Sequence, residues 1–161
     1  MKEYDVVIIG SGPAGLTAGL YCGRARLNTV VLEKNELGGL MPNIYSLENW
    51  PGALEGIPGA ELAGNTLAQV MNYDVVIESQ VMVQRMKVME NGKKEIITNE
   101  DTYLAIAVII AGGTHPRDLC IDGYSEYLGT SIHFCVMCAG EPCAGKVFAL
   151  MGAGVSAVRV A

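Results

Sequence analysis

Residues 5–33 read DVVIIGSGPAGLTAGLYCGRARLNTVVLE, and this stretch decides the fold. The apolar run 5–9 predicts a buried parallel strand, because such strands are covered on both faces. Segment 13–26 is rich in Ala, Leu and Gly and predicts a helix with proline in its first turn. Residues 29–32 predict a second buried strand. A strand–helix–strand unit of about thirty residues has the size of a nucleotide-binding crossover.

The turn between the first strand and the helix has the pattern G-x-G-x-x-G over residues 10–15. Gly10 permits the tight turn, Gly12 lets the backbone approach a pyrophosphate, and Gly15 lets helix and strand pack closely. The helix N-terminus offers free N–H groups and a positive dipole end to the phosphates. Glu33 closes the second strand, where it is placed to accept hydrogen bonds from ribose hydroxyls. Together these features predict a dinucleotide site, without deciding which dinucleotide binds.

Further elements follow along the chain. Residues 35–59 are rich in Gly, Pro and Asn and predict a loop, and 60–71 predict a helix. Strands are expected at 75–77, 81–89, 95–98, 102–110 and 146–151. The dipeptide at 91–92, Asn-Gly, predicts a hairpin because both residues tolerate positive φ. This order predicts an α/β fold: a Rossmann-like parallel sheet with a β-meander, then the start of a second Rossmann-like domain.

Composition excludes several classes of protein. The chain has 161 residues, is 50% hydrophobic and carries a net charge of −6. Phosphate backbones are bound by clustered Lys and Arg, so we expect no nucleic-acid partner. The longest apolar run, 104–111, is too short to span a bilayer, and the N-terminus lacks the pattern of a signal peptide. We therefore expect a cytoplasmic protein that is not bound to a membrane.

Two of the five cysteines form a Cys-x-x-Cys pair at Cys135 and Cys138. This spacing lowers the pKa of one thiol and, in a cytosolic protein, indicates a redox pair. One alternative is a zinc site formed by these two cysteines with His133 and Cys143. That set is crowded into one loop, whereas zinc sites usually join two separated pairs, so we expect no metal. Two buried structural cysteines are the other alternative.

The order of these motifs resembles the N-terminal portion of the low-molecular-weight thioredoxin reductases, the class II FAD- and NAD(P)-dependent pyridine nucleotide-disulphide oxidoreductases. The resemblance covers essentially the whole chain. A Cys-x-x-Cys pair just before a second nucleotide-binding strand is peculiar to this group and its close relatives. The matching segments are Gly10 to Gly15, Glu33, Gly38-Gly39, Glu48-Asn49-Trp50-Pro51-Gly52, Ala111-Gly112-Gly113, Pro116-Arg117, Cys135 to Cys138 and Gly152 to Ala157.

The resemblance implies two domains and two nucleotide sites. Residues 1–113 would form an FAD-binding domain whose last portion is absent here, and 114–161 the start of an NAD(P)-binding domain with the cysteine pair. The residues implied in FAD binding are Gly10, Ser11, Gly12, Pro13, Ala14, Gly15, Glu33, Lys34, Gly39, Leu40, Asn49, Val81, Ala111 and Gly112. Those implied in the NADPH site are Gly152, Gly154 and Ala157.

The implied activity passes electrons from NADPH through FAD to the Cys135–Cys138 disulfide, and on to thioredoxin or a thioredoxin-like protein. Cys138 would face the flavin, Cys135 would attack the protein substrate, and the enzyme would be a homodimer. Ala139 stands where the family usually has an aspartate, and Leu40 where it usually has a glutamine. The alternatives are a dithiol oxidase or peroxiredoxin-reducing flavoprotein, a relative using NADH or ferredoxin, and a flavin- or zinc-binding module without turnover.

Overall fold

The computed structural model describes residues 1–115, 117–134, 145–152 and 154. The chain divides into two compact units, Met1–Thr114 and His115–Ala161. The first unit holds the sheet, both longer helices and the glycine-rich turn. The assignment of residues 1–113 and 114–161 to two nucleotide-binding domains stays a prediction.

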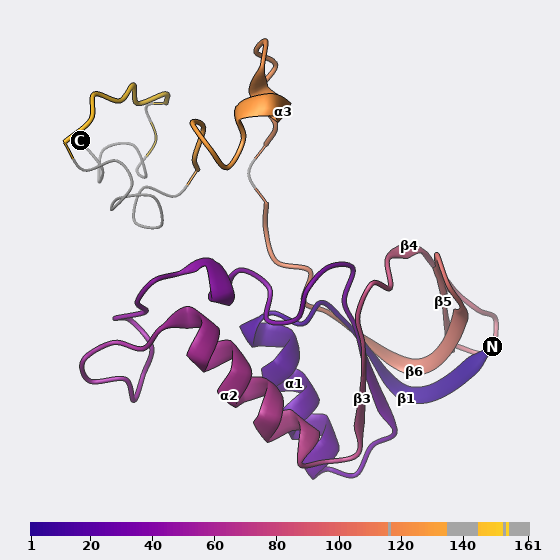
Figure 1. Cartoon of the computed structure of the whole chain (residues 1–161). Helices are drawn as coiled ribbons and strands as arrows, with labels where there is room; N and C mark the ends of the chain where they lie inside the picture. Colours follow the sequence, from indigo (N-terminus) through magenta and orange to yellow (C-terminus); the bar gives the residue numbers. More distant parts are fainter. Residues whose placement is uncertain (116, 135–144, 153, 155–161) are drawn as a thin grey trace. The chain divides into compact units, whose positions relative to one another are not determined.

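The first unit is built on a six-stranded sheet in the order β3-β2-β1-β6-β5-β4 (Figure 1). Strands β3, β2, β1 and β6 are parallel, and β5 and β4 continue the sheet as an antiparallel meander. This confirms the predicted α/β class and the parallel sheet with a β-meander. The bounds are β1 (Lys2–Ile9), β2 (Thr29–Leu32), β3 (Val75–Glu78), β4 (Val83–Val88), β5 (Lys94–Thr98) and β6 (Thr102–Ile110).

Helices α1 (Pro13–Arg24) and α2 (Gly59–Met71) lie side by side on one face of the parallel strands (Figure 1). Proline suits the first position of α1, where its missing N–H would have no intrahelical partner. The helix ends two residues earlier than expected, because the backbone turns into the left-handed region at Arg26 (φ 59). The predicted loop 35–59 also contains a short 3-10 helix, η1 (Met41–Asn43), which the sequence pattern did not indicate.

Both faces of β1 and β2 are buried, which explains their continuous apolar runs, whereas β6 exposes Ile106 and Ile110. Val6 and Ile8 pack under the helices, whereas Val7 points to the opposite face beside Ile96 and Tyr103. Successive side chains of a strand point to opposite faces, so one run of apolar residues supplies two cores. We call the cluster that contains Val7, Ile96 and Tyr103 the second core. It packs the meander against the parallel strands.

A polar cluster closes the edge of this second core. The Tyr103 side chain is fully buried and its hydroxyl donates a hydrogen bond to the Glu78 carboxylate, 2.5 Å away. The Lys2 ammonium lies 2.9 Å from Glu78 Oε1 and 3.2 Å from Asp101 Oδ2. Burial and the neighbouring Glu78 raise the pKa of Tyr103 to about 12. Tyr103 is therefore a neutral donor at ordinary pH, and the cluster joins β1, β3 and β6.

The second unit contains the short helix α3 (Tyr124–Tyr127), where the sequence predicted only a connecting segment. The predicted strand 146–151 is wrong: these residues have no strand partner among the described residues. Val147 and Phe148 are exposed, so the residues that the structure describes give this segment no apolar cover. Among the described helices, none is both long and apolar enough to cross a bilayer.

We predict that Tyr103→Phe lowers the free energy of unfolding by about 1.5–3 kcal/mol, the usual worth of a hydrogen bond to a charged group. Urea denaturation at pH 7 measures the change. Tyr4→Phe is the matched control, because Tyr4 is less buried and its ring lies 6.2 Å from that of Tyr103. The control should shift stability by less than about 0.5 kcal/mol. Equal losses in the two variants would contradict the role given to the Tyr103 hydroxyl.

Candidate functional site

The candidate site is the glycine-rich turn at the carboxyl end of β1. Gly10 has φ +103, and a Cβ at this position would lie 2.3 Å from the carbonyl oxygen of Ala111, which follows β6. The Gly10 N–H donates to the Leu32 carbonyl at 2.8 Å, so the same residue also touches the end of β2. Only glycine combines this backbone conformation with such close contacts.

Gly15 and Gly12 have different surroundings, although both belong to the motif. A Cβ on Gly15 would lie 1.8 Å from the Gly10 carbonyl oxygen, so Gly15 lets α1 start directly against the turn. A Cβ on Gly12 would meet no protein atom within 4 Å. Open space therefore lies in front of Gly12, at the end of α1 where the first N–H groups are free. This space suits a phosphate group, which the N-terminal end of a helix attracts.

Glu33 and Ser11 join the turn to the loop that follows β2. Glu33 Oε2 accepts hydrogen bonds from the Ser11 N–H at 2.8 Å and the Ser11 hydroxyl at 2.9 Å. Its Oε1 accepts a hydrogen bond from the Asn35 N–H at 3.0 Å. The Ser11 hydroxyl in turn accepts a hydrogen bond from the Gly38 N–H at 3.2 Å. Ser11 has no exposed surface and Glu33 is 8% exposed, so this network orders both loops from the inside.

The charge on Glu33 depends on this network. Burial acts to raise the pKa of the Glu33 carboxyl, but the N–H groups of Ser11, Asn35 and Lys34 and the Ser11 hydroxyl outweigh burial. The net result is a pKa below the ordinary value, so the buried carboxylate is ionised at neutral pH. The Ser11 N–H, the Ser11 hydroxyl and the Asn35 N–H thus hold both carboxylate oxygens in place.

Several residues predicted for the FAD site meet at this turn. A Cβ on Gly39 would lie 2.9 Å from Gly12 Cα, and one on Gly10 would lie 3.3 Å from Gly112 Cα. The Val81 N–H donates to the Glu33 carbonyl at 2.8 Å, which brings the segment after β3 to the same end of the sheet. The residues placed together at or beside the turn are Gly10, Ser11, Gly12, Pro13, Ala14, Gly15, Glu33, Gly39, Val81, Ala111 and Gly112.

Other predicted residues are not placed at the turn by a recorded contact. Lys34 and Leu40 are exposed and only neighbour it in sequence, and Asn49 is exposed in the loop before α2. Gly152 and Gly154 belong to the second unit. The positions outside the described residues are Cys135, Cys138, Ala139, Cys143 and Ala157. The predicted redox pair and NADPH contacts therefore stay predictions.

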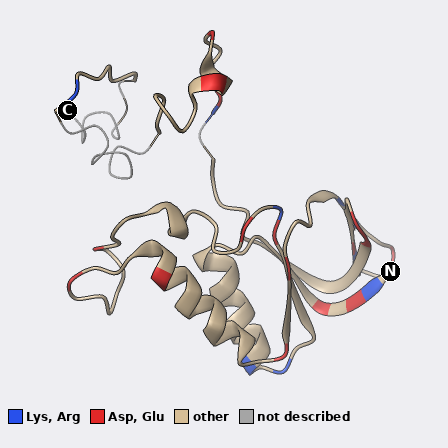
Figure 2. Cartoon of the chain, in the orientation of Figure 1, with Lys and Arg blue, Asp and Glu red and all other residues tan. Residues whose placement is uncertain are grey.

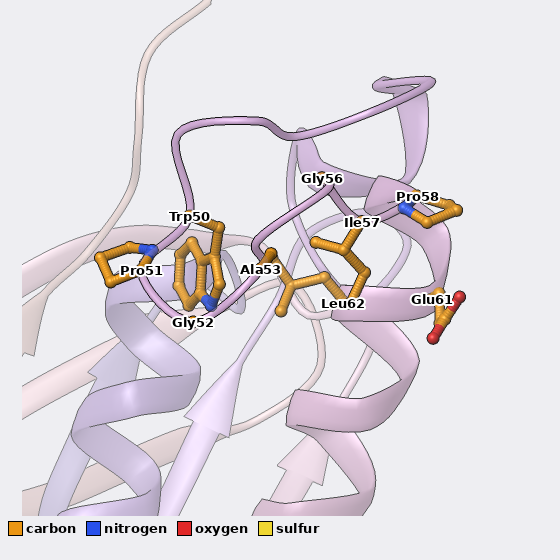
Figure 3. Close-up of a pocket in the computed structure, with 9 residues that line it drawn as sticks. All are labelled: Trp50, Pro51, Gly52, Ala53, Gly56, Ile57, Pro58, Glu61 and Leu62. Carbon is orange, nitrogen blue, oxygen red and sulfur yellow. The ribbon is translucent and has the colours of Figure 1, made fainter.

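A cavity of about 420 Å³ lies beside the start of α2, a feature that sequence reasoning missed. Figure 3 shows Trp50 at one end, Glu61 at the other, and Ile57 and Leu62 between them. Lys and Arg are absent from residues 35–84, and the charged residue of the lining is Glu61, on the first turn of α2, which Figure 2 draws in red. A lone tryptophan inside a Pro- and Gly-rich loop was the only signal in the sequence.

We predict stability effects of very different size for two alanine substitutions in the motif. Gly15→Ala should lower the free energy of unfolding by at least about 3 kcal/mol, because the new methyl group would overlap backbone atoms. Gly12→Ala should change stability by less than about 1 kcal/mol, because its φ of −67 suits any residue and its surroundings are open. Thermal unfolding followed by circular dichroism measures both. A severe loss of stability in Gly12→Ala would show that the space in front of Gly12 is not open.

We also predict a pH-dependent loss of stability in Glu33→Gln. The folded pKa of Glu33 lies below its unfolded value of about 4.3, so ionised Glu33 stabilises the fold above that pH. This contribution disappears as the pH falls through the folded pKa. The variant should lose at least about 1.5 kcal/mol at pH 7, because an amide nitrogen faces N–H donors, and less near pH 3. Urea denaturation from pH 3 to 7 measures the difference, with the exposed Glu36→Gln as the control. A constant difference across this range would contradict the assignment.

Comparisons with known proteins agree with this geometry. The family model described as pyridine nucleotide-disulphide oxidoreductase matches residues 4–161. A 34.2 kDa protein in the rubredoxin operon of Clostridium pasteurianum is 40% identical over 161 residues, covering 99% of this chain and 51% of that protein. The thioredoxin reductase of Ureaplasma parvum is 39% identical over 160 residues, with coverages of 99% and 51%.

Solved structures lead to the same group. The crystal structure of T. acidophilum thioredoxin reductase superposes with a TM-score of 0.76 at 37% identity, covering 88% of this chain and 46% of that one. The chain spans about half the length of the curated relatives it matches. The glycine-rich turn after β1, the buried acid after β2 and a family match over nearly all residues lead to one conclusion. The chain belongs to the pyridine nucleotide-disulphide oxidoreductase family.

Proposed function

We propose that the chain is the N-terminal portion of an FAD-dependent disulfide reductase that transfers electrons from NADPH to thioredoxin or a thioredoxin-like protein. The observation that carries the proposal is the open space at Gly12, bounded by the N-terminus of α1 and connected through Ser11 to the buried Glu33 carboxylate. Its geometry suits the pyrophosphate and ribose of a dinucleotide. The family membership supports the same reading.

The residues of the turn would hold FAD in distinct ways. Gly12 leaves room for the phosphates, and the first N–H groups of α1 offer them hydrogen bonds. Glu33 would accept a hydrogen bond from a ribose hydroxyl and is already held in place by Ser11 and Asn35. Bound FAD supplies the two-electron exchange between a pyridine nucleotide and a disulfide. The protein contributes the position and the electrostatic field of the site.

The proposed redox pair is Cys135 and Cys138. Cys138 would face the flavin, and Cys135 would attack the disulfide of the protein substrate as a thiolate. A thioredoxin disulfide has a potential near about −270 mV, so the enzyme's pair must lie within a few tens of millivolts of it. Gly152, Gly154 and Ala157 would begin the NADPH site. We further propose a cytoplasmic homodimer.

The test uses the full-length protein with two substitutions that separate cofactor binding from disulfide reduction. Gly12→Val should give a folded protein without flavin absorbance, because the side chain would occupy the space of the pyrophosphate. Cys138→Ser should keep the flavin spectrum and abolish NADPH-dependent reduction of thioredoxin. Cys22→Ser, in the half-buried Cys22 of α1, is the matched control and should keep both. Full reductase activity in Cys138→Ser would refute the mechanism.

The same assays distinguish the alternatives. Turnover with oxygen in place of thioredoxin would indicate a dithiol oxidase, and turnover with NADH or reduced ferredoxin would reassign the electron donor. Stoichiometric zinc that is lost in Cys143→Ser would indicate a metal-binding module. In the second unit, the His133 Nε2 lies 2.9 Å from the Thr130 carbonyl oxygen, so this ring already has a polar neighbour.

A further inference from the structure

The turn between β3 and β4 has a backbone conformation that its own sequence does not favour. Gln80 has φ 63, in the left-handed region that favours glycine. A non-glycine residue persists there only when the surroundings hold it, and such residues concentrate at ligand sites. The turn directly follows the carboxyl end of β3, the edge of a parallel sheet where nucleotides bind.

Asn99 holds this turn from the neighbouring hairpin between β5 and β6. Its Oδ1 accepts a hydrogen bond from the Met82 N–H at 2.6 Å, and its Nδ2 donates to the Gln80 carbonyl at 3.1 Å. The Asn99 N–H donates to the Met82 carbonyl at 3.2 Å. Thr98 fixes the hairpin itself, because its hydroxyl accepts hydrogen bonds from the N–H groups of Glu100 and Asp101. One side chain therefore bonds to the residues on both sides of Val81.

Val81 connects the turn to the candidate site. Its side chain is 5% exposed in the second core, and its N–H donates to the Glu33 carbonyl at 2.8 Å. A change of φ at Gln80 would move Val81 and break this bond. The position of the backbone beside Glu33 thus depends on Asn99, although Asn99 belongs to another turn. No sequence pattern indicated this link, because residues 80 and 99 belong to different strand connections.

We propose that Asn99 is a positioning residue for the adenosine half of the bound dinucleotide, acting through Gln80 and Val81. This inference rests on the proposed function, because it takes FAD as the ligand and Glu33 as the ribose acceptor. Asn99 itself touches no ligand in this assignment. It keeps the left-handed turn in place before the ligand arrives, so less of the binding energy is spent on ordering the turn.

The experiment measures the binding of FAD and of ADP to the full-length apoprotein, by flavin fluorescence and by calorimetry. ADP contains the adenosine and the pyrophosphate but no flavin. Asn99→Ala should raise the Kd of both by a similar factor, about tenfold. Adding Gln80→Gly to Asn99→Ala should recover part of the lost affinity, because glycine takes a positive φ without steric cost. Asn91→Ala is the matched control, since Asn91 accepts a comparable hydrogen bond from the Lys93 N–H in another turn, and should change neither Kd.

Three outcomes would overturn the proposal. If Asn99→Ala lowers only the melting temperature and leaves the Kd of FAD and ADP unchanged, Asn99 has a purely structural role. If Asn99→Ala weakens FAD binding but leaves ADP binding unchanged, Asn99 acts on a part of FAD outside its adenosine half. A wild-type apoprotein that binds neither FAD nor ADP would refute the proposed function as well. The first two outcomes, in contrast, would refute only the role given to Asn99. If Asn99→Ala fails to fold, Asn99→Asp keeps the acceptor for Met82, loses the donor to Gln80 and should weaken FAD and ADP equally.

Discussion

The structure depends on three backbone segments that meet without side chains between them at the carboxyl end of β1. The turn at Gly10 touches the carbonyl of Ala111 after β6, and Gly15 brings the start of α1 against the same turn. Because the contacts are between main-chain atoms, no neighbouring rotamer can relieve an added methyl group. The close approach fixes where the helix begins relative to the sheet. It thereby creates the open space in front of Gly12.

A second constraint is electrostatic. Glu33 is ionised inside the protein, where a carboxylate is tolerated only if donors replace its lost water. Ser11 and Asn35 supply those donors, and Ser11 extends the network to Gly38. The acid that the motif assigns to ligand binding is therefore also a structural anchor for two loops.

The sequence predicted the parts of the fold that follow from local patterns. The apolar runs of β1, β2 and β6 and the glycine motif have signals confined to a few neighbouring residues, and all appear in the structure, although β1 begins at Lys2 and not at residue 5. What it could not predict depends on distant contacts: the Tyr103–Glu78 bond and the Asn99 contacts join residues far apart in the chain. The expected strand at 146–151 failed for the same reason. Apolar residues make a strand only when another strand lies beside them.

The Ser11 hydroxyl has a consequence for how the protein responds to ligand concentration. It donates to the Glu33 carboxylate and accepts from the Gly38 N–H, so it links the glycine-rich turn to the loop after β2. A molecule that occupies the space at Gly12 therefore stabilises both loops by mass action. At a free concentration one hundred times its Kd, this linkage adds about 2.7 kcal/mol to the folded state. The loaded and empty forms should differ in resistance to heat and proteases as well as in colour.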